Sequence, residues 1–186
     1  MNTRRVVLAI AITAATAACG DEESGLNGSL SFNHSGAISG SFSAVGRFPI
    51  FGEFGTSAWA MGSRDDQNDV IGVIAVAPGE SERYDMIVIA VPRVSPGSAT
   101  IDANCSGPAC AVVSVEFGLS EEDSDFSHVC FLDAGTVAIS SVSDTRVSGS
   151  FSGTGTCTDD TGATMSFGVT SGSFSVPLIS GTGMIP

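Results

Sequence analysis

The chain contains no lysine, and its seven basic residues are all arginines. Twenty acidic residues oppose them, so the formal net charge is −13. Such an acidic protein is not expected to bind nucleic acid, because the negatively charged phosphate backbone repels it. The same charge opposes adsorption to an anionic lipid surface. We therefore expect no nucleic-acid partner, and membrane attachment must come from something other than a basic patch.

Long apolar runs are also scarce. The run from Val6 to Ala15 is shorter than the ~20 residues that a membrane-spanning helix needs, and no later segment is long enough. Arg4 and Arg5 precede this run, and Thr16-Ala17-Ala18-Cys19-Gly20 closes it. A short charged start, an apolar run and small residues in this order are typical of a secretory signal.

This segment resembles bacterial lipoprotein signals, in which a small residue precedes a cysteine that receives lipid and becomes the mature N-terminus. The resemblance implies that residues 1–18 are removed and that lipid on Cys19 anchors the protein in the bacterial cell envelope, facing the periplasm or the exterior. Thr16 departs from the family pattern, which prefers an aliphatic residue there. The alternative is a plain secretory signal, with Cys19 lost or left as a free thiol. The Arg4-Arg5 pair also resembles a twin-arginine signal, but the short n-region favours ordinary export.

Cleavage would leave five arginines against 20 acidic residues, a formal net charge of −15. Residues 19–27 are small and acidic, so they cannot bury enough surface to offset their ordering entropy, and we interpret them as a flexible tether. Residues 28–186 are about 160 residues, enough for one domain with its own core.

Helical periodicity is missing, since no stretch of ten residues shows a convincing apolar period of 3.6. Short β-rich runs between Gly, Pro, Asp and Asn predict an all-β fold, either an antiparallel β-sandwich or a calycin-like β-barrel. The strands expected before Val129 are 28–33, 37–48, 57–62, 70–77, 84–92, 99–102 and 111–119, and four more should follow it. The only candidate for a helical turn is 119–126.

Two runs, 70–76 and 86–91, are apolar on both faces, which predicts central strands covered on two sides. Pro78-Gly79 begins the loop between them and indicates a hairpin. Most other strands alternate Ser or Thr with Phe, Val or Ile, a pattern that needs one solvated face.

One pentapeptide, Ser-Gly-Ser-Phe-Ser, occurs at 39–43, 148–152 and 171–175. Each copy points one Phe inward between outward serines. Serine-rich strands carry little charge to block edge pairing, so the sheet should close on itself. We expect the last two copies to be neighbours joined by a turn at 158–162, with the first copy closing the sheet against them.

The stretch from Gly135-Thr136-Val137-Ala138-Ile139 through 147–152 to 172–177 resembles the C-terminal signature of a family of uncharacterised bacterial β-rich lipoproteins. It covers about a third of the chain. The resemblance implies a lipid-anchored, calycin-like or sandwich β-domain, and it carries over no catalytic or binding residue.

Beyond Cys19 the mature chain holds four cysteines, and an even number in an exported protein favours disulfides. Three pairings are possible. Cys105 and Cys110 bracket a Gly-Pro turn that a local bridge would suit. A hairpin about Asp144 makes opposed residue numbers sum to about 288, and Cys130 and Cys157 sum to 287, with a bulge possible at 133–135. We therefore pair Cys105 with Cys110 and Cys130 with Cys157. A zinc site is disfavoured because the C-x2-C spacing is missing.

Catalytic and metal motifs are weak. Residues 149–153 are Gly-Ser-Phe-Ser-Gly, which differs from G-x-S-x-G because Phe151 stands at the serine position. That motif also works only where a strand turns into a helix, and here another β-run follows. The two histidines, His34 and His128, have no visible partner set. The carboxylates of 65–69 and 121–125 could offer oxygens to calcium, although solvated loops explain them better. Trp59 and Tyr84 are too few for a carbohydrate platform.

We expect a non-enzymatic binding or interaction module with no cofactor and no metal. Its partners would be the membrane, through the lipid, and an envelope protein. The first alternative is a carrier of a small apolar ligand, which needs a cavity among Phe42, Phe151, Phe174 and the two apolar strands. A structural protein would fill that space with side chains. A hydrolase, a further alternative, needs a converging His, Ser and carboxylate set.

Overall fold

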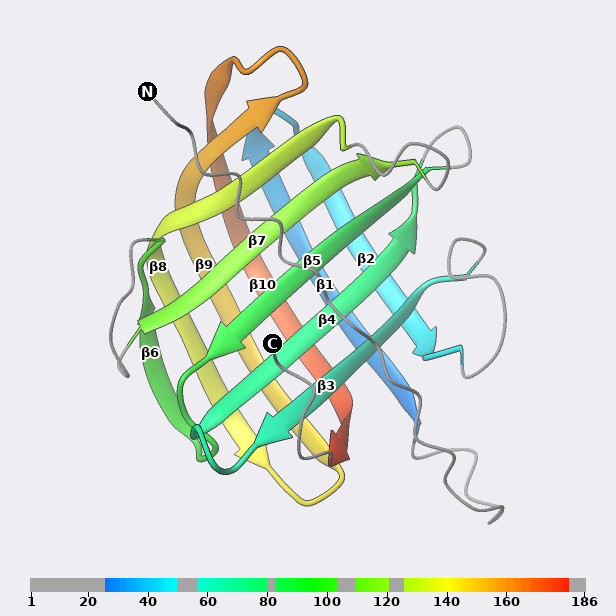
Figure 1. Ribbon diagram of the computed structural model, residues 1–186, viewed down its shortest axis with the longest axis vertical. Coiled ribbons are helices and arrows are strands. Elements are labelled where there is room, and N and C mark those ends of the chain that lie inside the picture. The colour runs from blue at the N-terminus through cyan, green and yellow to red at the C-terminus, as the bar shows by residue number, and fades with distance from the viewer. Residues whose placement is uncertain (1–25, 50–56, 80–82, 104–109, 121–125, 181–186) are drawn as a thin grey trace.

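The computed structural model describes residues 26–49, 57–79, 83–103, 110–120 and 126–180. Within these ranges the chain forms ten strands and no helix, which confirms the predicted all-β class (Figure 1). The strands are β1 (Asn27–Gly36), β2 (Gly40–Arg47), β3 (Trp59–Asp65), β4 (Val70–Pro78), β5 (Tyr84–Val91), β6 (Gly97–Ile101), β7 (Cys110–Leu119), β8 (His128–Val142), β9 (Arg146–Asp159) and β10 (Thr164–Ser180).

All ten strands belong to one sheet that closes into a barrel-like ring. Its order is β2-β1-β10-β3-β4-β5-β7-β6-β8-β9, and β9 pairs back onto β10. Most neighbours are antiparallel, whereas β3 with β10 and β6 with β7 are parallel. The ring closes along β10, whose residues 164–177 pair with β9 and whose residues 178–180 pair with β3. Closure meets the requirement set by serine-rich strands, because a ring leaves few open edges.

The strands expected before Val129 correspond to β1 to β7, and the β4–β5 hairpin is confirmed, with Ile74 opposite Val88. From His128 onward the described residues form three strands, not four, so that expectation was wrong. All three are long, and β8 and β10 contain bulges that let a strand bend without ending. One bulge in β10 lies between Val169 and Gly172, where Ser171 has a φ of 54°. The helical-turn candidate lies mostly outside the described residues.

The last two copies of the pentapeptide are neighbours as predicted, with Ser150 of β9 opposite Ser173 of β10. The first copy, at 39–43, does not close the sheet against them, because β1 lies between β2 and β10. Its phenylalanine nevertheless reaches the same core. Phe42 stacks on Phe32 of β1 with ring centroids 5.0 Å apart.

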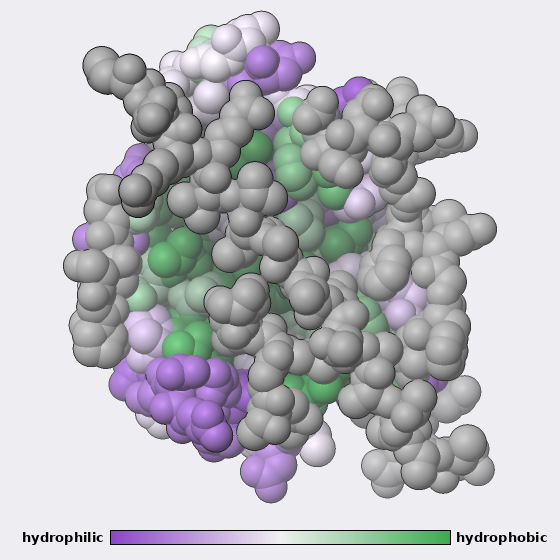
Figure 2. All heavy atoms as spheres, in the orientation of Figure 1, coloured by the Kyte–Doolittle hydropathy of each residue, from purple (hydrophilic) through white to green (hydrophobic). Residues whose placement is uncertain are grey.

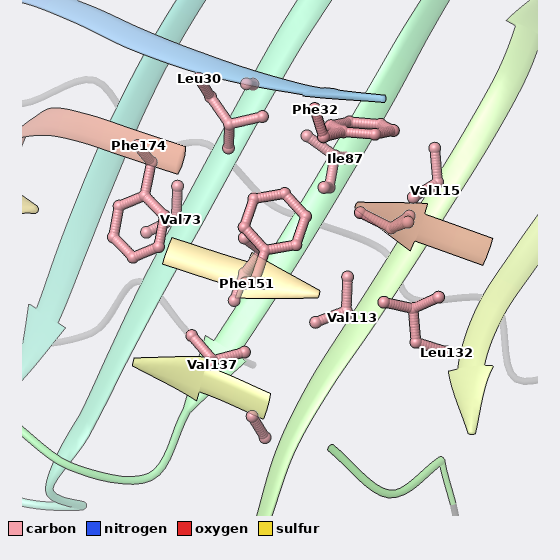
Figure 3. Packing of buried hydrophobic residues seen from close by; sticks show 14 of the residues in the cluster. Leu30, Phe32, Val73, Ile87, Val113, Val115, Leu132, Val137, Phe151 and Phe174 are labelled. Carbon is pink, nitrogen blue, oxygen red and sulfur yellow. The ribbon is translucent and has the colours of Figure 1, made fainter. Parts of the chain in front are cut away.

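The barrel interior is filled by apolar side chains from all around the wall. Phe32 and Phe151 meet edge to face at 5.7 Å, and Phe151 lies 6.5 Å from Phe174. Figure 3 shows Phe151 between β1 and the wall formed by β4, β5 and β7. On that wall Ile87 and Val113 are completely buried. The inward faces of the two apolar strands therefore form the centre of the core, as predicted.

Two glycines allow β1 and β2 to approach β3. A Cβ atom on Gly28 would collide with the carbonyl oxygen of Ala60, and one on Gly46 would collide with that of Ala58. These close contacts hold the start of β1 and the end of β2 against the start of β3. That part of β3 does not pair with β10. Any larger side chain at either glycine would push the strands apart.

Candidate functional site

The outer surface of the barrel has two kinds of face. On β1, β9 and β10 hydroxyls lie side by side across the strands. Ser31 Oγ is 3.5 Å from Ser173 Oγ, and Ser148 Oγ donates to Ser175 Oγ at 3.0 Å. On β3, β4, β5, β7 and the start of β8 the outward side chains are instead largely apolar. We call this second surface the outer apolar face, and its members are Trp59, Met61, Ile74, Val76, Met86, Val88, Ala90, Val112, Val129 and Phe131.

Strand register arranges these side chains in rows across the sheet. In one row Ile74 lies opposite Val88, Val88 opposite Ser114, and Ser114 opposite Phe131. Directly opposed residues on one face have Cβ atoms about 4.5–5.5 Å apart, so each row is continuous. The alternation that buries Ile87 in the core also turns Val88 outward, because successive side chains point to opposite faces.

Cover over the outer apolar face is uneven. Trp59 and Val76 are only 2% and 3% exposed. The ring of Phe48 packs edge to face on Trp59 at 4.9 Å, and Ile179 packs against the same cluster. Toward β8 the face opens, and Phe131 is 44% exposed. Figure 2, in the orientation of Figure 1, shows green, hydrophobic residues over these strands between the grey atoms. The sequence predicted that both faces of β4 and β5 are covered. Their inward face is completely covered by the core, whereas their outward face is only partly covered.

One carboxyl group lies within this apolar surface. Glu116 of β7 is opposite Met86 of β5 on one side and Val129 of β8 on the other. Burial raises the pKa of Glu116. Among the described residues its carboxylate has neither a hydrogen bond nor an ion pair. The nearby Arg83 donates instead to the carbonyl of Gly118, at 3.1 Å.

Sequence reasoning missed Glu116. A signal was present, since it is the only charged residue in the run 110–119, whose alternate side chains enter the core. A single charged residue on an apolar strand normally faces solvent. It faces an apolar surface instead when the outward side chains of the two adjacent strands are also apolar. Those neighbours belong to β5 and β8, and only the fold brings them beside β7.

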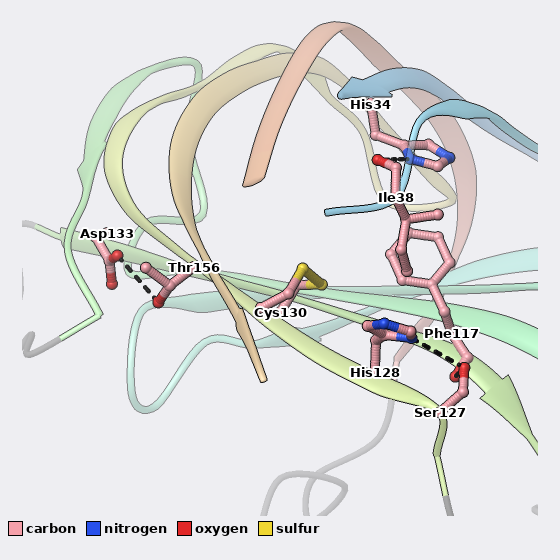
Figure 4. The surroundings of a disulfide bond; sticks show 9 residues. His34, Ile38, Phe117, Ser127, His128, Cys130, Asp133 and Thr156 are labelled. Carbon is pink, nitrogen blue, oxygen red and sulfur yellow. Dashed lines mark hydrogen bonds between the residues drawn. A yellow bond between two sulfur atoms is a disulfide. The ribbon is translucent and has the colours of Figure 1, made fainter. Parts of the chain in front are cut away.

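The disulfide predicted between Cys130 and Cys157 is present and buried near one mouth of the barrel (Figure 4). The bulge suggested at 133–135 is also present, as a register shift between Leu132 and Ala134. Cys110 is disulfide-bonded. Its predicted partner, Cys105, lies outside the described residues.

Both histidines lie at this mouth, one on each side of Phe117 (Figure 4). His34 Nδ1 is 3.0 Å from the carbonyl oxygen of Ile38, which closes the β1–β2 turn, and its ring is 5.0 Å from that of Phe117. His128 Nδ1 is 3.3 Å from Ser127 Oγ, and that hydroxyl donates to the carbonyl of Phe117 at 2.8 Å. The hydroxyl proton of Ser127 is therefore directed away from the imidazole.

In the run 149–153, Ser150 lies in the middle of β9 and faces outward opposite Ser173 and Ala138. A nucleophile elbow instead needs a sharp turn from strand to helix. The described part of the chain thus places neither histidine beside Ser150, because His34 and His128 lie toward the other end of the paired strands.

The carboxylates of the acidic run 65–69 already have hydrogen-bond or ion-pair partners within the protein. Hydrogen bonds to its carboxylate lower the pKa of Asp65, and the bond from the Asn68 side chain has the largest effect. Asp66 pairs with Arg64 at 2.6 Å, and Asp69 accepts from the backbone N–H of Val94 at 3.0 Å. Within the described ranges no three His, Cys, Asp or Glu side chains are grouped closely enough for a metal ion. The second run, 121–125, lies outside these ranges.

No protein-family model matches the chain, and no curated protein or solved structure matches it significantly. The part of the chain that the structure describes contains no helix of the length and apolar character needed to cross a bilayer. Residues 1–18 and Cys19 lie outside that part, so cleavage and lipidation stay predictions.

Proposed function

We propose that this protein is a lipid-anchored, non-enzymatic interaction module of the bacterial cell envelope, facing the periplasm or the exterior, and that it binds a protein partner through the outer apolar face. The observation that carries the proposal is the contrast between two surfaces of one barrel. Strands β1, β9 and β10 present hydroxyls, whereas β4, β5 and β7 present Ile74, Val88 and Val112. A contiguous apolar surface on an otherwise polar exterior is typical of an interaction site.

The barrel interior supports this function over carriage of a small apolar ligand. Phe32 and Phe42 are stacked, and Phe151 contacts both Phe32 and Phe174 in the centre of the barrel. A ligand placed among these rings would have to displace side chains that already fill the space. We also propose, on the sequence resemblance, that the chain belongs with uncharacterised β-rich lipoproteins.

Site-specific photocrosslinking in the producing cells tests the proposed surface. A photoreactive phenylalanine analogue would replace Val88 or Phe131 on the outer apolar face. Matched controls would carry it at Ser150 or Ser173 on the hydroxyl face. We expect a discrete adduct with another envelope protein from the first pair only, and Val112→Asp in the same chain should abolish it. Equal adducts from both faces, or none from the first pair, would refute the surface.

A further inference from the structure

We infer that the partner presents a basic side chain to Glu116, so that the outer apolar face recognises an apolar protein segment with a central lysine or arginine. This inference depends on the function proposed above and specifies the chemistry of the partner. The carboxylate of Glu116 lies among Met86, Val129 and their neighbours.

Glu116 lies in the last row of the surface, the row nearest Gly118 and Arg83. Its directly opposed neighbours are apolar on both sides. Two of the diagonal neighbours are Val88 and Phe131, about 7–8 Å away by strand geometry. A partner that covers Val88 and Phe131 must therefore also cover Glu116 and remove water from its carboxylate.

A covered carboxylate without a partner is costly, because burial disfavours its charged form. The described chain supplies no hydrogen bond to it, and Arg83, the cation at this end of the face, is engaged with the carbonyl of Gly118 at 3.1 Å. A lysine or arginine from the partner would satisfy the carboxylate with a charge-assisted hydrogen bond. A partner carboxylate at the same place would be repelled.

The charge of the whole protein favours the same partner. The chain has no lysine, and its net charge is −13. A basic segment would be attracted over long range before it docks, and it would be held locally by the pair with Glu116. The apolar neighbours provide area, whereas the ion pair fixes the register and excludes acidic competitors.

The test uses three fluorescein-labelled peptides that differ only at the centre, Ser-Val-Leu-Lys-Leu-Val-Ser and its Gln and Glu counterparts. Their affinities for the whole protein, as the cell produces it and held in phosphatidylcholine nanodiscs, are measured by fluorescence anisotropy. We expect the Lys peptide to bind roughly five- to tenfold more tightly than the Gln peptide, and the Glu peptide to bind most weakly.

Variants separate the local pair from general attraction. Glu116→Gln should bring the ratio of Lys to Gln peptide affinities close to one, and Glu116→Lys should make the Glu peptide the tightest. Asp144→Asn removes the same charge in the exposed turn at the far end of β8 and should leave the ratio unchanged.

The outcomes distinguish this inference from the proposed function. Equal binding of the Lys and Gln peptides to the unmodified protein, or a preference that survives Glu116→Gln, would overturn the role of Glu116 and leave the apolar surface standing. If none of the three peptides binds, both the inference and the apolar surface as a peptide-binding site are refuted.

Discussion

Cys130 of β8 lies directly opposite Cys157 of β9, and a disulfide joins them with their Cα atoms 3.9 Å apart. Both are completely buried, and 27 residues separate them in the sequence. Replacing both by alanine should lower the free energy of unfolding by about 3 kcal/mol, because the unfolded chain regains the entropy of an open loop. Urea denaturation of the variant measures the loss. An unchanged midpoint would contradict a stabilising bridge.

Two phenylalanines should respond very differently to truncation. Phe151 contacts Phe32 and Phe174 inside the barrel, so Phe151→Ala should cost about 3–5 kcal/mol through lost burial and the cavity that it leaves. Phe131 is 44% exposed on the outer apolar face, and Phe131→Ala should change stability by less than about 0.5 kcal/mol. Thermal unfolding followed by circular dichroism distinguishes them. Similar losses would mean that the face is a second core.

The approach of β1 to β3 depends on Gly28. Gly28→Ala should destabilise the protein by roughly 1–3 kcal/mol, because the added Cβ would collide with the carbonyl oxygen of Ala60. The matched control is Gly168→Ala, where the nearest atom is Ser35 Oγ at 3.4 Å, an ordinary contact. Denaturant midpoints of the two variants provide the comparison. Equal midpoints would show that the strands separate at little cost.

Stability should depend on pH through Glu116. Burial raises its pKa above the ordinary value of 4.5, so the folded protein holds this proton more tightly than the unfolded chain does. The contribution of Glu116 to the free energy of unfolding should therefore fall as the pH rises from 4.5 through the raised pKa, and stay at that lower level above it. Below this window Glu116 is protonated in both states and contributes no difference.

Glu116→Gln should remove this dependence. At neutral pH we expect its Tm to exceed that of the unmodified protein by about 1–3 °C, and at acidic pH the two should agree. Asp144→Asn, in an exposed turn, is the control for the loss of one charge. A lower Tm for Glu116→Gln at neutral pH would reveal a stabilising partner for the carboxylate.

Anchoring is expected to depend on Cys19. Cys19→Ser removes the thiol that would receive lipid, so the protein should lose its acyl mass and move from the detergent phase to the aqueous phase in Triton X-114 partition. Intact mass and phase partition measure both effects. An acyl mass that persists in the serine variant would exclude Cys19 as the site of the lipid.

Local patterns determined much of this molecule. Alternation of Ser with Phe in the pentapeptide indicated which side chains enter the core, since side chains on a strand alternate between two faces. Antiparallel register about the turn at Asp144 was sufficient to bring Cys130 close to Cys157, and two bulges in β8 place them directly opposite each other. These predictions required only information within a single hairpin.

Tertiary structure decided the rest, because strand neighbours that are distant in sequence leave no local pattern. Periodicity could not show that β1 lies beside β10 and that β2 does not. It also could not predict the parallel pairing of β10 with β3. It also could not tell whether the outward face of Val88 would be covered. The apolar surroundings of Glu116 come from β5 and β8, which only the closed sheet brings to either side of β7.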